Sequence, residues 1–90
     1  MVKKDVKVIN PTGIHLRPAG NLVKMAKKCT SETLITKDGK SEDPKRLLKL
    51  LTLEIGCGSI ITVSCDGPNE EEDLKMLVDY IESGLGELDG

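Results

Sequence analysis

The spacing of the apolar residues changes along this chain of 90 residues, and the order of the changes limits the folds that it can adopt. Val2, Val6 and Val8 alternate with charged residues, which is the period of two of a half-buried strand. Residues 10–13 (NPTG) interrupt that strand. From about Leu16 the apolar residues recur at the spacing of an amphipathic helix. The residues of its predicted buried stripe are Ala19, Leu22, Val23 and Ala26.

A hairpin and a second helix are predicted next. Residues 33–37 and 40–43 indicate two strands on either side of residues 38–39 (DG), a dipeptide that suits the positive φ angles of a tight turn. Asp43 followed by Pro44 is typical of a helix start. We therefore expect a short helix that begins at residue 44 and ends before the glycine at 56.

The last third of the chain predicts one more strand and one more helix. Residues 60–65 are rich in β-branched side chains, and Asn69 is placed to cap a helix whose first turn, residues 70–73, is acidic. The expected buried face of this helix consists of Leu74, Leu77, Val78 and Ile81. The glycine-rich tail, residues 84–90, is predicted to fray.

The resulting element order is βαββαβα. Strands too short to be buried on both sides favour an antiparallel sheet. We therefore predict one α+β domain over residues 1–90, with a four-stranded antiparallel sheet covered on one face by three helices.

The composition argues against several classes of protein. There is one Tyr and no Phe or Trp, so stacking platforms for nucleic-acid bases are absent, and we expect no nucleic-acid partner. No apolar run is long enough for a membrane span and the N-terminus does not resemble a signal peptide, so we expect a cytoplasmic protein. Cys29, Cys57 and Cys65 form no paired framework and are predicted to be reduced core residues. Together with a single His they lack metal-ligand spacing, so we predict no metal and no cofactor.

Charge is distributed unevenly along the chain. Residues 1–50 hold twelve Lys or Arg against five Asp or Glu, a net charge of +7, whereas residues 51–90 hold one against ten, a net charge of −9. A basic half that formed one face would attract an acidic partner surface. Ordinary solvated helix faces are the simpler explanation of the same counts.

His15, the only histidine, lies in the turn that opens the first predicted helix. The first N–H groups of a helix have no intrahelical partner and attract anions such as phosphate. Arg17 can add a bidentate guanidinium to the same anion. A neutral imidazole nitrogen is a nucleophile that can accept a phosphoryl group. No Asp or Glu lies between Asp5 and Glu32, so no carboxylate close in sequence would repel that group.

Residues 13–19 (GIHLRPA), together with the length and element order, resemble HPr, the histidine-containing phosphocarrier family of the bacterial phosphoenolpyruvate:sugar phosphotransferase system. The resemblance covers essentially the whole chain and implies an open-faced β-sandwich. It implies that His15 accepts a phosphoryl group on Nδ1 from phosphorylated enzyme I and donates it to sugar-specific enzyme IIA domains. Arg17 and the backbone N–H groups of Leu16 and Arg17 would hold the phosphate. Such a protein is a carrier and not a turnover enzyme, and we expect a monomer.

The same resemblance implies a docking surface for the partners. In the family an apolar patch lies beside the active histidine, ringed by lysines, and helical geometry places a basic stripe on the outward side of the first helix. Leu50 and Leu53 are predicted to be core residues. The predicted docking residues are Gly20, Lys24, Lys27, Lys40, Lys45, Leu47, Leu48, Lys49 and Leu51.

Two positions depart from the expected pattern. Many relatives carry a regulatory serine where this chain has Arg46, which cannot accept that modification, so we expect no such control. Gly20 lies in the first helical turn, where it either lets a partner backbone approach or is neutral variation. Arg46 also leaves open an HPr-like carrier of a nitrogen-related or dihydroxyacetone-kinase relay. A nucleic-acid-binding domain that uses the basic half and a purely structural interaction module are the alternatives outside the class.

Overall fold

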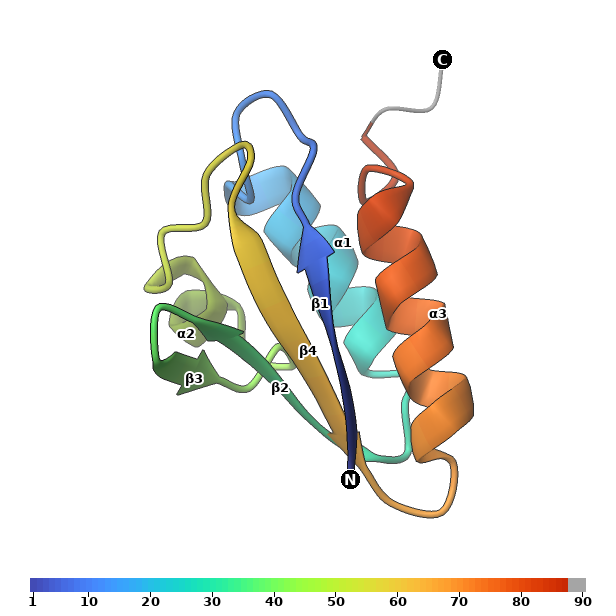
Figure 1. Cartoon of the computed structure of the whole chain (residues 1–90). Coiled ribbons are helices and arrows are strands. Elements are labelled where there is room, and N and C mark those ends of the chain that lie inside the picture. Colours follow the sequence, from blue (N-terminus) through green and yellow to red (C-terminus); the bar gives the residue numbers. More distant parts are fainter. Residues whose placement is uncertain (88–90) are drawn as a thin grey trace.

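The computed structural model describes residues 1–87, and its elements follow the predicted order (Figure 1). The strands form one antiparallel sheet in the order β1-β4-β2-β3, which confirms the α+β class and the open-faced arrangement. The helices contribute their apolar faces to one core against this sheet. The elements are β1 (Val2–Lys7), α1 (Leu16–Ala26), β2 (Glu32–Lys37), β3 (Lys40–Glu42), α2 (Leu47–Leu51), β4 (Ile60–Asp66) and α3 (Glu70–Glu82).

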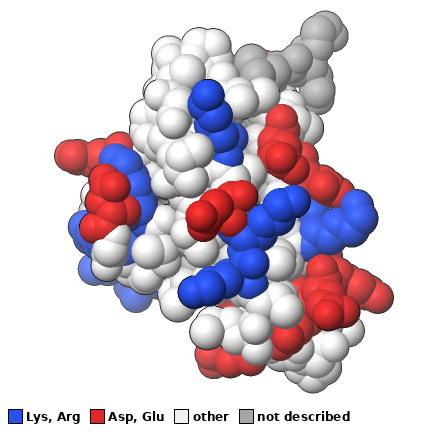
Figure 2. All heavy atoms as spheres, viewed as in Figure 1, with Lys and Arg blue, Asp and Glu red and all other residues white. Residues whose placement is uncertain are grey.

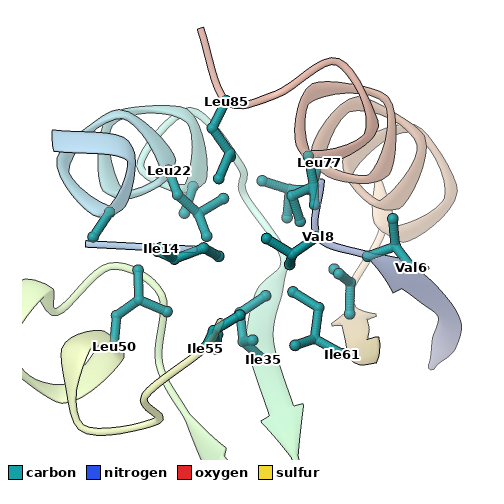
Figure 3. Packing of buried hydrophobic residues seen from close by; sticks show 14 of the residues in the cluster. Val6, Val8, Ile14, Leu22, Ile35, Leu50, Ile55, Ile61, Leu77 and Leu85 are labelled. Atoms are coloured by element: carbon teal, nitrogen blue, oxygen red, sulfur yellow. The ribbon is translucent and has the colours of Figure 1, made fainter. Parts of the chain in front are cut away.

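The core lies between the helices and the central strands. Ile61 of β4 pairs with Val6 of β1, and both side chains are buried; for Val6 the alternating pattern predicts this burial. Leu22 of α1 and Leu77 of α3 point toward these strands (Figure 3). The predicted buried stripe of α1 is confirmed at all four positions.

The turn between β2 and β3 also follows the sequence. Asp38 and Gly39 have φ angles of 51° and 82°, so both central residues adopt the positive values that a two-residue hairpin turn requires. The hairpin leaves β3 at the edge of the sheet, where its three residues pair only with β2. Such a short edge strand offers little free backbone for pairing with other chains.

The predicted start of the second helix is wrong. Asp43 Oδ1 accepts a hydrogen bond from the Lys45 backbone N–H at 2.8 Å, and the Arg46 N–H donates to the Asp43 carbonyl at 3.0 Å. These bonds close a turn, because a short carboxylate competes with the helix for nearby N–H groups. Helix α2 therefore begins at Leu47 and has five residues, with Leu50 buried as predicted.

The chain after α3 does not fray over the residues that the structure describes. The Leu85 N–H donates to the Tyr80 carbonyl and the Gly84 N–H to the Ile81 carbonyl, which is the paired bonding of a Schellman turn. Leu85 is fully buried and points between α1 and α3 (Figure 3). The prediction of a frayed tail is therefore wrong for residues 84–87, and its last part, residues 88–90, lies outside the described residues.

Two of the three cysteines are core residues. Cys29 and Cys65 are buried, and burial raises the pKa of each thiol to about 11. A thiol that stays protonated at neutral pH is a poor nucleophile, so we expect both of these cysteines to be unreactive. The prediction is wrong for Cys57, which is exposed in the bend before β4, between two glycines.

Asp73 joins α3 to the turn that leads into β2. Its Oδ2 accepts hydrogen bonds from the Ser31 hydroxyl at 2.6 Å, the Ser31 N–H at 3.0 Å and the Thr30 N–H at 3.2 Å. These hydrogen bonds lower the pKa of this buried carboxyl below its ordinary value of 3.8. The bond from the Ser31 hydroxyl has the largest effect, and the two backbone N–H groups add to it. The ionised form of Asp73 therefore stabilises the fold.

We predict that Asp73→Asn lowers the free energy of unfolding at pH 7 by about 1.5–3 kcal/mol, the range for hydrogen bonds to a charged acceptor. A depressed folded-state pKa stabilises the protein above the unfolded value and loses this effect as pH falls through the folded value. The difference between wild type and variant should therefore shrink below pH 3.8. Urea denaturation at neutral and acidic pH measures it. Asp79→Asn, at an exposed ion pair with Lys75, is the control and should change stability much less than Asp73→Asn at neutral pH, because solvent screens an exposed pair.

Candidate functional site: the start of the first helix

A close contact between two loops fixes the turn that carries His15. Gly13 has a φ angle of 71°, and a Cβ atom there would lie 2.3 Å from the carbonyl oxygen of Ile55. The Ile14 N–H donates to that same carbonyl at 2.8 Å, and the Ile14 side chain is buried. Only glycine permits this approach with this backbone conformation. The next residue, His15, is thereby held at the entrance to α1.

His15 occupies the N-cap position of α1. Its backbone is extended, with φ −94° and ψ −165°, and its side chain makes no capping hydrogen bond. Its carbonyl accepts the first helical bond, from the Ala19 N–H at 2.9 Å. The N–H groups of Leu16 and Arg17 therefore lie in the first turn without intrahelical partners, and no acidic residue occupies this turn.

The side chains at this helix start are accessible. The His15 side chain is 44% exposed, and Arg17 is exposed. Within residues 1–87 the Arg17 guanidinium has no hydrogen-bond or ion-pair partner, so its donors are available to an anion. Imidazole, guanidinium and two free N–H groups thus lie at one helix start.

A carboxylate that the local sequence does not predict lies beside the imidazole. Oε2 of Glu87 is 3.1 Å from Nε2 of His15, although no Asp or Glu is close to His15 in sequence. The Glu87 side chain is only 19% exposed. The prediction concerned only carboxylates close to His15 in sequence, and the sequence has none there; Glu87 reaches the imidazole through the fold.

Asn10 holds the Glu87 carboxylate in place by a hydrogen bond. Its side chain is fully buried, and its Nδ2 donates to Oε1 of Glu87 at 2.9 Å and to the Gly84 carbonyl at 2.8 Å. Asn21 of α1 adds a bond from its Nδ2 to the Leu85 carbonyl at 2.8 Å. The end of the described chain is thus attached to the loop before His15 and to the helix after it.

The leucines of α2 divide between core and surface. Leu48 is 76% exposed, whereas Leu47 and Leu51 are half-buried and pack against the core. The residues from Arg46 to Lys49 line a shallow hollow. Leu16, beside His15, is a further exposed apolar side chain, at 64%. The sequence predicts a role only for its backbone, because helical spacing does not show that this side chain is exposed.

The predicted basic residues occupy different environments. Lys24, Lys27 and Lys49 are exposed, as a docking rim requires. Lys45 is half-buried, and its Nζ donates to the Ser31 carbonyl at 3.4 Å, beyond the end of α1 that is remote from His15. Lys40 Nζ donates to the Thr52 carbonyl at 3.5 Å. A Cβ atom at Gly20 would meet no other atom within 4 Å, which is compatible both with close approach of a partner backbone and with neutral variation.

The separation of charge along the sequence is not matched by the face seen in Figure 2. Basic and acidic side chains are interspersed there, because the antiparallel pairing brings early and late segments together. In the same way, packing of α3 against β1 places Lys4, Glu71 and Asp79 around one surface hollow. Among residues 1–87, no helix is long and apolar enough to cross a membrane.

Comparison with known proteins places these observations in a family. The family model described as "PTS HPr component phosphorylation site" matches residues 2–83. The phosphocarrier protein HPr of Haemophilus influenzae is 44% identical over 81 residues, which are 90% of this chain and 95% of that protein.

Solved structures of HPr proteins have the same fold as this chain. The crystal structure of HPr-C-His from Thermoanaerobacter tengcongensis has a TM-score of 0.91 at 37% identity and covers 97% of this chain and 98% of that one. An HPr dimer from the same organism has a TM-score of 0.76 at 37% identity, covering 97% of this chain and 100% of that one. From the family model, the identity and the shared fold, it follows that this chain belongs to the HPr family of phosphocarrier proteins.

Proposed function

We propose that this protein carries a phosphoryl group on His15, taken from phosphorylated enzyme I and passed to sugar-specific enzyme IIA domains of the phosphotransferase system. The observation that carries the proposal is the exposed imidazole at the N-cap of α1, next to two N–H groups and the Arg17 guanidinium that have no partner within residues 1–87. These groups supply a nucleophile and a cradle for the transferred anion.

Nδ1 is the proposed attacking atom. Nε2 of His15 lies beside the Glu87 carboxylate, and Nδ1 has no hydrogen-bond partner among residues 1–87. A neutral imidazole with its proton on Nε2 has its lone pair on Nδ1. This arrangement supports the nitrogen that the family resemblance implies.

The site is suited to a carrier because it is incomplete. Phosphoryl transfer depends on positioning and on charge neutralisation, and two docked proteins can divide these tasks. Here the chain offers one nucleophile and one arginine on an open surface, and within residues 1–87 the imidazole is 44% exposed. The phosphohistidine would therefore be a transient intermediate within a relay and not a product of turnover by this protein alone.

Docking is proposed at the surface made by exposed Leu16 and Leu48, with half-buried Leu47 and Leu51 beneath and lysines at the rim. An apolar centre with a charged rim gives a short-lived complex whose encounter the charges accelerate. Gly20, Lys24, Lys27, Lys45 and Lys49 remain proposed members of this surface. Arg46, exposed before α2, carries no hydroxyl that could accept a regulatory phosphate.

We further propose that the carrier acts in the cytoplasm as a monomer, without nucleic acid or membrane insertion. Because an HPr from T. tengcongensis has been crystallised as a dimer, every transfer assay needs a control measurement of the oligomeric state. Analytical ultracentrifugation at the protein concentration of the assay measures this oligomeric state. Transfer to enzyme IIA, compared with transfer to acceptors of nitrogen-related and dihydroxyacetone-kinase relays, identifies the relay.

The first prediction of this function concerns His15. Incubation of the protein with phosphoenolpyruvate and enzyme I should add one acid-labile phosphoryl group, because phosphorylated imidazole hydrolyses in acid. His15→Ala should add none, since the chain contains no other histidine. Intact-mass measurement before and after acid treatment gives the result. A phosphoryl group that survives acid, or one present on His15→Ala, would contradict the proposed acceptor.

The second prediction concerns Arg17. Arg17→Ala should reduce kcat/KM for phosphoryl transfer by about tenfold or more, the usual scale for one charge-assisted contact to a phosphate. The free energy of unfolding should change by less than about 0.5 kcal/mol, because the exposed guanidinium has no partner within residues 1–87. Stopped-flow transfer and urea denaturation measure the two quantities. Equal losses in both would show a structural role.

The third prediction concerns the docking surface. Leu48→Ser should raise KM for enzyme I by about fivefold or more, as expected for a central contact of an interface. Leu34→Ser is the matched control, because Leu34 is also an exposed leucine, at 43%, but lies on β2 in the sheet. Its KM should stay within about twofold of wild type. Similar KM values for the two variants would remove α2 from the proposed interface.

A further inference from the structure

We propose that Glu87 is a positioning residue for His15, holding the imidazole with its proton on Nε2 and its lone pair on Nδ1. The proposal rests on the function proposed above and adds a residue that the sequence around His15 does not indicate. The observation is the 3.1 Å approach of Glu87 Oε2 to His15 Nε2.

The contact selects one tautomer of the ring. If Nε2 carried a lone pair, that lone pair and the carboxylate oxygen would repel each other at 3.1 Å, whereas a proton on Nε2 is attracted to the oxygen. The neutral ring therefore favours the form with the Nε2 proton. In that form the free lone pair is on Nδ1, on the other side of the ring from Glu87.

The carboxylate is held in place by the fold. Its second oxygen, Oε1, accepts from the buried Asn10 Nδ2 at 2.9 Å. Gly86, just before it, has a φ angle of 73°, and a Cβ atom there would lie 2.9 Å from Oη of Tyr80. Leu85 anchors the preceding turn in the core. Glu87 thus reaches His15 from a fixed backbone, which is the requirement for a positioning group.

The same carboxylate balances the charge that transfer creates. The Nδ1 lone pair forms the new bond to phosphorus, and the bond between phosphorus and the donor atom of the phosphorylated partner breaks, leaving its electron pair on the donor. The proton on Nε2 stays in place, so the ring becomes a cation. A carboxylate at 3.1 Å stabilises that cation. Donation to the next partner reverses each of these changes.

The position of Glu87 limits its cost to the reaction. A carboxylate near the first-turn N–H groups would compete with the phosphate for them, and α1 has no acidic residue in its first turn. Glu87 approaches the opposite ring nitrogen instead. Within residues 1–87, no other Asp or Glu forms an ion pair with His15. One carboxylate therefore acts on the ring while the phosphate cradle stays open.

The tautomer is measured directly, because this chain of 90 residues contains one histidine and ¹⁵N-histidine labelling reports on it alone. At a pH where the ring is neutral, the two ¹⁵N shifts give the ratio of the tautomers. In wild type the Nε2-protonated form should predominate. Glu87→Gln should lower this ratio by about threefold or more, because an amide can donate to Nε2 as well as accept from it. Glu82→Gln, the same charge change at an exposed position of α3, should leave the ratio unchanged.

The transfer rate supplies the second readout. Glu87→Gln should slow phosphoryl transfer from enzyme I by about three- to tenfold, a smaller effect than for an orienting carboxylate in an enclosed active site. Glu82→Gln should transfer at the wild-type rate. Urea denaturation confirms that both variants are folded under the conditions of the assay.

The outcomes separate this inference from the proposed function. A lower tautomer ratio together with slower transfer in Glu87→Gln supports the positioning role. An unchanged ratio, or an altered ratio with wild-type transfer, overturns the role of Glu87 while normal transfer by wild type leaves the carrier function intact. Failure of wild type to accept any phosphoryl group would overturn both.

Discussion

The buried amide of Asn10 joins the loop before His15 to the end of the described chain, and the candidate site depends on this connection. One Nδ2 group donates to both the Gly84 carbonyl and the Glu87 carboxylate. Because Asn10 is fully buried, loss of these partners would leave a donor unsatisfied in the core, at a cost of about 1–3 kcal/mol. The connection is therefore part of the fold and not a surface contact that opens freely.

A second constraint acts on the other side of the same loop. Gly13 allows the backbone to meet the Ile55 carbonyl, while Asn10 attaches the loop to the turn after α3. Residues 10–14 are thus held from two directions, and His15 follows with little freedom of its own backbone. A nucleophile fixed before its partner arrives loses little entropy on docking, which suits a protein that must meet one partner and then another.

The sequence predicts what depends on neighbours along the chain. Alternation predicted β1, and β-branched residues predicted β4. Helical spacing predicted the buried stripe of α1, and residues 38–39 predicted the hairpin turn. His15 and Arg17 are two residues apart, so the helix start alone brings them together. Glu87 and Asn10 meet only through packing of α3 against the first strand, and no local pattern reports such a contact. The predicted start of α2 was wrong for a different reason. The Asp43 carboxylate accepts a hydrogen bond from the Lys45 N–H and so closes a turn before the helix.

The tail shows where a stronger prediction was available from the same residues. Glycine after a helix, followed by an apolar residue, is the signal of a Schellman turn, in which the apolar side chain folds back onto the helix. Gly84 and Leu85 fit that signal, and the structure buries Leu85 completely. The turn sends the chain back toward α1, and a residue two positions later then lies within reach of the helix start. The direction of the tail follows from sequence, whereas the identity of its partner requires the three-dimensional structure.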